Sequence, residues 1–77
     1  MNQKRREKII ELAEKLDDLR IDLEAIRDEE QEAYDNLPES LQLSDKAADM
    51  QTVVDTLTEC VDQLDDLAQT LEEVAAW

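Results

Sequence analysis

The chain has 77 residues and a formal net charge of −14, because 22 Asp and Glu residues outnumber eight Lys and Arg residues. A chain this short forms one small domain, whose core stabilises only marginally without metals, disulfides or oligomerisation. Cys60 is the only cysteine, which excludes a disulfide within the chain, and charges interrupt every apolar stretch well before the roughly 20 residues that cross a bilayer. We expect a single domain over residues 1–77, cytoplasmic and without a signal peptide.

The negative charge is concentrated in the last two thirds of the chain. Residues 1–27 contain seven cations and seven acids, whereas residues 28–77 contain Lys46 alone and 15 acids. Such a surface repels nucleic acid and anionic membranes and attracts basic surfaces. We therefore expect a protein partner with a basic surface, and no direct binding of nucleic acid or membrane.

Composition and spacing both favour an all-α fold. The chain has no glycine and a single proline, so the turns of β-hairpins lack their usual residues. Apolar residues recur instead at alternating steps of three and four, which is typical of helices that pack as a coiled coil. The expected architecture is an antiparallel two-helix coiled-coil hairpin that dimerises into a four-helix bundle.

The first helix is predicted over about residues 3–36. Its seam consists of apolar residues and one acid, namely Ile9, Leu12, Leu16, Leu19, Leu23, Ile26, Glu30, Ala33 and Leu37. Two pairs at four-residue spacing, Glu11 with Lys15 and Arg20 with Glu24, favour the helix further.

Glu30 is the one charged residue on this seam and has two interpretations. It reaches water or pairs with a cation such as Arg27 or Lys46. Alternatively, it is a polar position that fixes register and oligomeric state at a cost in stability.

A turn is predicted at about residues 37–44. Pro38 disfavours helical geometry at the preceding residue and cannot donate a backbone hydrogen bond. The three leucines of the turn, Leu37, Leu41 and Leu43, are expected to fold inward and close the end of the core.

The second helix is predicted over about residues 45–76, with Ser44 as its N-cap. Its main seam contains Met50, Val54, Leu57, Val61, Leu64, Ala68 and Leu71. Beside the seam runs an apolar flank, Val53, Cys60, Leu67 and Val74. Together they cover roughly 160° of the helix, more than one antiparallel neighbour needs. The flank is therefore expected to make a homodimer contact or to dock a partner helix.

Antiparallel pairing about the turn is expected to set Leu23 near Leu57 and Leu16 near Leu64. Side chains outside this contact should then face water.

The residues needed for most enzyme chemistry are missing. There is no histidine to act as a general base or metal ligand, and no glycine for a phosphate-binding loop. Cys60 lies on the apolar flank, where a structural role is expected. We predict no catalytic residues, no metal site and no cofactor, and hence a protein that is not an enzyme.

An acidic column is predicted on the second helix, opposite its apolar seam. Its members recur at steps of four, three, four and seven residues, and are Asp55, Glu59, Asp62, Asp66 and Glu73. Like charges at four-residue spacing destabilise a helix slightly, so stability does not explain the column. It serves solubility, or it occupies a groove that a basic protein uses for nucleic-acid phosphates.

Residues 26–42, IRDEEQEAYDNLPESLQ, carry a family resemblance. An acidic segment with an aromatic residue and Asn-x-Pro-Glu, followed by a helix of apolar and acidic residues, resembles short acidic helical-hairpin proteins of bacteria and their phages or mobile elements. These proteins are mostly uncharacterised, and the likeness covers about residues 20–75. It implies a bacterial or infected host cell and, for phage-encoded acidic miniproteins, binding to a host protein.

Two functional hypotheses follow. In the first, the acidic column blocks a basic, nucleic-acid-binding surface of a host or defence protein, as an inhibitor that mimics DNA. In the second, the chain is a structural or accessory helical-bundle protein that acts through its apolar flank, and its charge serves solubility.

Overall fold

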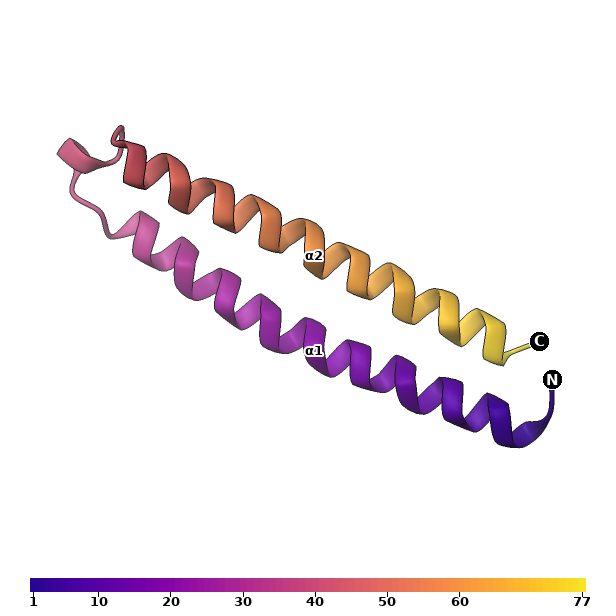
Figure 1. Ribbon diagram of the computed structural model, residues 1–77. Helices are drawn as coiled ribbons and strands as arrows, with labels where there is room; N and C mark the ends of the chain where they lie inside the picture. Colours follow the sequence, from indigo (N-terminus) through magenta and orange to yellow (C-terminus); the bar gives the residue numbers. More distant parts are fainter.

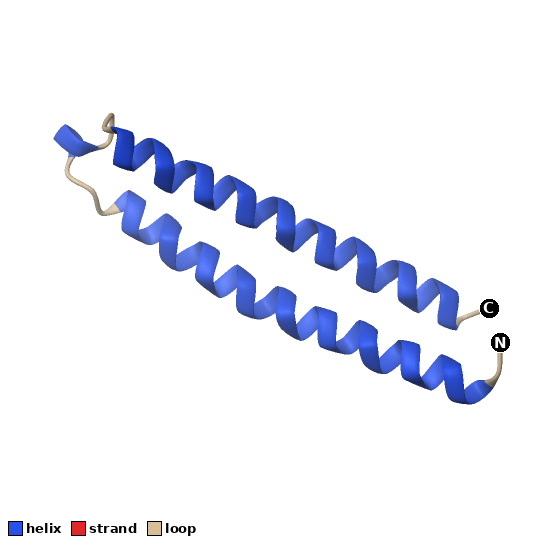
Figure 2. Cartoon of the chain, in the orientation of Figure 1, coloured by secondary structure: helices blue, strands red, loops and turns tan.

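The computed structural model describes all residues 1–77, and they form two long helices and one short connection. Helix α1 covers Gln3–Asp35, the 3-10 helix η1 covers Glu39–Leu41, and α2 covers Asp45–Ala75. The two long helices lie side by side and antiparallel, with both termini at the end opposite the connection (Figures 1 and 2). No strand is present, so the prediction of an all-α hairpin of two packed helices is confirmed.

Both long helices begin at a side-chain cap. The Asn2 side chain accepts a hydrogen bond from the Arg5 backbone N–H at 2.9 Å, and the Ser44 hydroxyl accepts one from the Ala47 N–H at 3.2 Å. These bonds satisfy backbone donors that the first turn of a helix leaves free. The Ser44 cap fixes where α2 starts, directly after the turn.

The connection is built without any residue of positive φ, which suits a chain that has no glycine. Leu37 is half-buried as expected, whereas Leu41 is 48% exposed and Leu43 is 98% exposed. The prediction that all three leucines close the core is therefore wrong for two of them. Leu41 ends the 3-10 turn and Leu43 follows it, and both side chains face outward.

The inward face of α2 follows the predicted seam. Buried alanines and valines alternate with half-buried larger residues at steps of three and four, in the order Ala47, Met50, Val54, Leu57, Val61, Leu64, Ala68, Leu71 and Ala75. This is the spacing by which one helix keeps a single face toward its neighbour.

Helix α1 is rotated relative to the predicted seam. Its inward face is a second row with the same three-and-four spacing, Arg6, Ile9, Ala13, Leu16, Arg20, Leu23, Arg27, Glu30 and Tyr34, of which Ala13 is buried and the others are half-buried. Four of the nine seam residues instead face outward, since Leu12 is 52% exposed, Leu19 56% and Ile26 54%, and Ala33 is also exposed. The rotation brings Arg20 against the acidic helix α2.

Two polar side-chain contacts join the two helices. Arg20 Nε lies 3.9 Å from an Asp65 carboxylate oxygen, and Arg6 donates a hydrogen bond to the Trp77 carbonyl oxygen. Leu23 and Leu57 are both half-buried and lie on the inward faces of the two helices, and their expected pairing stays a prediction.

The hairpin buries little of its own surface. Only six residues are buried, the largest of them Val54 and Val61, and the long axis of the molecule extends 60 Å. The accessible surface is 5734 Å², whereas an average folded monomer of this mass exposes about 4,800 Å². A pair of helices therefore leaves much of the amphipathic chain uncovered.

Candidate interaction surfaces

The acidic column lies on the outer side of α2. All five of its members, Asp55, Glu59, Asp62, Asp66 and Glu73, are exposed. None has a cation within 4.0 Å, because the ion pairs of the protein involve other carboxylates. Four-residue and three-residue steps separate the first four carboxylates by roughly 6 and 4.5 Å along the axis. The column is thus a row of unneutralised charge on a straight rod.

A polar face lies on one side of the hairpin, centred on Arg20. The guanidinium is hydrogen-bonded to Glu24 at 2.8 Å and lies 3.7 Å from Asp17, both on α1, and it also reaches Asp65 on α2. The hydrogen bond to Glu24 is the largest cause that raises the pKa of Arg20 above its ordinary value. Desolvation opposes it, and the charges of Glu24, Asp17 and Asp65 raise the pKa further. The predicted Arg20–Glu24 pair is confirmed.

The Arg20 cluster itself was not predicted. Its signal in the sequence is that Arg20 stands seven residues after Ala13 and seven before Arg27, on a row that has the spacing of an inward face. The other expected pair, Glu11 with Lys15, is not formed.

An apolar face lies on the opposite side of the hairpin from the polar face. It consists of residues that each precede an inward-facing residue by one position, namely Leu12, Leu19, Ile26 and Ala33 of α1 and Val53, Cys60, Leu67 and Val74 of α2. Cys60 and Val74 are half-buried and the other six are exposed. Sequence reasoning assigned the α2 members to a flank but placed the α1 members inside the hairpin.

The apolar residues of α1 and those of α2 lie on the same face of the hairpin because the two helices are antiparallel. A two-fold axis perpendicular to the plane of such a pair exchanges one helix with the other and leaves each face where it is. Residues that precede an inward-facing position therefore lie on one face in both helices. The opposite flank shows the same rule, because Asp17, Glu24 and Asp65 each follow an inward-facing residue and all three surround Arg20. The apolar stripes of both helices are therefore centred off the contact between them, toward the same side.

Glu30 lies on the inward face near the turn and is half-buried. Neither Arg27 nor Lys46 forms an ion pair with it, and Arg27 binds Asp28 instead, with Nη2 3.1 Å from the carboxylate. The Glu30 carboxylate is thus a partly desolvated charge without a cation partner.

The protein contains no pocket and no group of three or more His, Cys, Asp or Glu side chains placed to hold a metal ion. Cys60 is a free, half-buried thiol on the apolar face. Neither long helix contains a segment apolar enough to span a membrane. The structure offers three surfaces for binding, namely the acidic column, the polar face and the apolar face.

Comparison of the chain with protein-family models, with curated proteins and with solved structures finds no match.

Proposed function

We propose that the chain is a non-enzymatic protein-binding module, whose acidic column blocks a basic, nucleic-acid-binding surface of another protein. The observation that carries this proposal is the exposure of all five carboxylates of the column with no cation beside any of them. Unpaired like charges on one helix oppose its stability, and a basic partner relieves that repulsion.

The shape of the column also suits a groove that binds nucleic acid. Helix α2 has 31 residues and is roughly 45 Å long, and its carboxylates follow one side of it as phosphates follow a strand. Lys and Arg side chains that bind phosphates then bind these carboxylates in their place. The resemblance to acidic phage proteins makes a bacterial host or defence protein the expected target.

Self-association is the second part of the proposal. The apolar face exposes large side chains from both helices over a length of roughly 30 Å, and monomeric proteins rarely leave such a continuous patch uncovered. A second copy that covers this face forms a four-helix bundle and leaves both acidic columns on the outside. The dimer then presents two binding surfaces for basic partners.

An alternative function is favoured by the same apolar face. In that case the chain is a structural or accessory protein whose apolar face docks a helix of another protein, and its charge serves solubility. The two functions differ in salt dependence. Binding through the acidic column weakens steeply as ionic strength rises, whereas apolar docking persists.

Reversal of two carboxylates tests the acidic column directly. The chain, the Asp62→Lys/Asp66→Lys variant and a control, Glu11→Lys/Asp18→Lys, are immobilised and exposed to a bacterial lysate. The control has the same net charge, and its exposed positions lie on the outer side of α1. We expect the chain and the control to retain proteins that elute at high salt, and the Asp62/Asp66 variant to lose them.

The retained proteins are then purified and assayed for binding to duplex DNA in a mobility-shift experiment. The chain should release the DNA, and the Asp62→Lys/Asp66→Lys variant should not. Equal retention by all three forms of the chain, or retained proteins that keep their DNA, would show that the column does not act in this way.

A further inference from the structure

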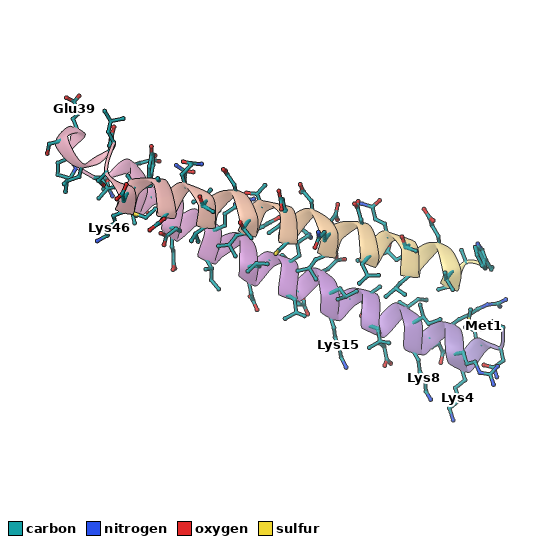
Figure 3. All side chains as sticks on the ribbon, turned by 45° about the horizontal axis from the view of Figure 1, so that its top comes forward. Met1, Lys4, Lys8, Lys15, Glu39 and Lys46 are labelled. Carbon is teal, nitrogen blue, oxygen red and sulfur yellow. The ribbon has the colours of Figure 1, made fainter.

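Charged residues beside the apolar face indicate how a second copy covers it, given the proposed self-association. Besides the apolar residues, α1 carries a mixed-charge column with a seven-residue repeat, consisting of Lys8, Lys15, Asp22 and Glu29. All four side chains are exposed, and none forms an ion pair within the chain. Figure 3 shows Lys8 and Lys15 extending from α1 in the same direction.

The mixed-charge column borders the apolar face. Each of its members lies three or four residues from Leu12, Leu19 or Ile26, which places it beside them on the helix surface. A partner that covers the apolar face therefore also meets these four charges at the rim of the contact.

The charges change sign at the middle of α1. Lys8 and Glu29 lie equally far from the midpoint between Asp18 and Leu19, roughly 16 Å on either side, and Lys15 and Asp22 lie roughly 5 Å on either side. This midpoint lies half a residue from Leu19, the centre of α1, Gln3–Asp35. A two-fold axis there overlays two hairpins over their full length.

We propose that a second copy of this chain covers the apolar face with its turn at the opposite end, so that α1 packs antiparallel on α1 of the second copy. Lys8 then faces Glu29 of the other copy, Lys15 faces Asp22, and Leu19 meets its own equivalent beside the axis. Such a self-complementary interface is the usual form of a symmetric dimer.

The other symmetric arrangement, with both turns at the same end, lacks this complementarity. It places α1 over α2 of the second copy, where the bordering column, Asp49, Thr56, Gln63 and Thr70, contains no cation. It also brings together the two turn-proximal halves, residues 19–65, each with 14 acids and three cations. Like-charge repulsion disfavours that arrangement.

The available area fits a stable dimer. The hairpin measures 60 by 14 Å between its outermost backbone positions, so a contact along the face covers on the order of 800 Å² per copy. That is the area of a standard stable protein interface. A second copy of the chain therefore has the length, the apolar surface and the charges that match this face.

Two charge-reversed variants test the orientation. In Lys8→Glu/Lys15→Glu the mixed-charge column is entirely acidic, and in Asp22→Lys/Glu29→Lys it is entirely basic. In the proposed dimer each variant opposes like charges when alone, whereas an equimolar mixture pairs all four positions. We expect the dissociation constant of each variant alone to rise about tenfold at low salt, since four exposed ion pairs are lost, and the mixture to form heterodimers.

Sedimentation equilibrium and native mass spectrometry measure these species. The control is Glu11→Lys/Asp18→Lys, which has the net charge of Asp22→Lys/Glu29→Lys but changes exposed positions away from the face, and it should dimerise like the unmodified chain. A preference for heterodimers supports the proposed orientation. If the unmodified chain dimerises but the mixture shows no such preference, the orientation is wrong and the self-association stands.

If the unmodified chain stays monomeric at several hundred micromolar, the self-association is wrong as well. Neither outcome affects the acidic column, because Asp62 and Asp66 lie on the outer side of α2 and are tested separately.

Discussion

Arg20 of α1 and Asp65 of α2 form an ion pair that joins the two helices, with Nε 3.9 Å from the carboxylate oxygen. The same guanidinium binds Glu24 and approaches Asp17, so one cation serves three carboxylates. In a chain of net charge −14, this is where the repulsion between α1 and α2 is locally relieved.

Replacement of Arg20 by Gln should lower the melting temperature, because Asp17, Glu24 and Asp65 are left without their cation. The decrease should shrink in 0.5 M salt, where exposed charges are screened. Circular dichroism melts at two salt concentrations measure both effects. Arg5→Gln removes an exposed cation that makes no ion pair and should change the melting temperature less.

The raised pKa of Arg20 gives this contribution its pH dependence. A basic group whose pKa is higher in the folded protein than in the unfolded chain stabilises the fold fully at any pH below its unfolded pKa. This stabilisation is lost only as the pH rises through the folded pKa, which for Arg20 lies in strong alkali. Between pH 5 and 9 the difference in stability between Arg20→Gln and the unmodified chain should therefore stay constant. A difference that disappears toward pH 9 would contradict the ion-pair assignment.

Val61→Ala should lower the free energy of unfolding by about 2 kcal/mol, because the side chain is only 5% exposed and its loss leaves a cavity between the helices. The matched control is Val53→Ala on the apolar face, where the side chain is 43% exposed and the cost should be less than half as large. Urea denaturation at low micromolar concentration, which limits association, measures both. Equal losses would show that α2 is rotated differently.

Ser44→Ala should lower the free energy of unfolding by about 1 kcal/mol, because the Ala47 N–H loses its acceptor at the start of α2. Ser40→Ala, at an exposed position in the turn, serves as the control and should be nearly neutral. Urea denaturation followed by circular dichroism compares the two. A neutral Ser44→Ala would mean that α2 begins elsewhere.

Glu30→Leu should stabilise the protein by about 1 kcal/mol, because it replaces a half-buried charge that has no cation partner with a side chain suited to the contact. Glu32→Leu, at an exposed position two residues away, should have little effect on unfolding in urea. Sedimentation of Glu30→Leu distinguishes the two interpretations of this residue. A polar register position predicts a new oligomer in the variant, and a merely solvated carboxylate predicts none.

The helices follow from the sequence because the spacing of apolar residues and Pro38 act locally. The rotation of α1 does not, because two of its rows, one through Leu12 and Leu19 and one through Ala13 and Arg20, have the same alternation of three and four residues. Apolarity favours the first row and the structure uses the second. The second row brings Arg20 to Asp65, a contact that the spacing of apolar residues does not predict.

The candidate surfaces could likewise be predicted only in part from the sequence. Exposure of Asp55 and Asp62 follows from their position opposite a seam that α2 keeps. The α1 half of the apolar face depends on the rotation, so Leu12 and Leu19 were assigned to the core.

The two chain ends lie close together, so the order of the two helices in the sequence can be exchanged. Met1 and Trp77 lie at the same end of the hairpin, and Arg6 already contacts the Trp77 carbonyl oxygen. A short peptide that joins them, combined with a break at the fully solvated Leu43, gives a circular permutant in which the second helix is synthesised first. Because the side chains that meet are the same in either order, the permutant should adopt the same hairpin.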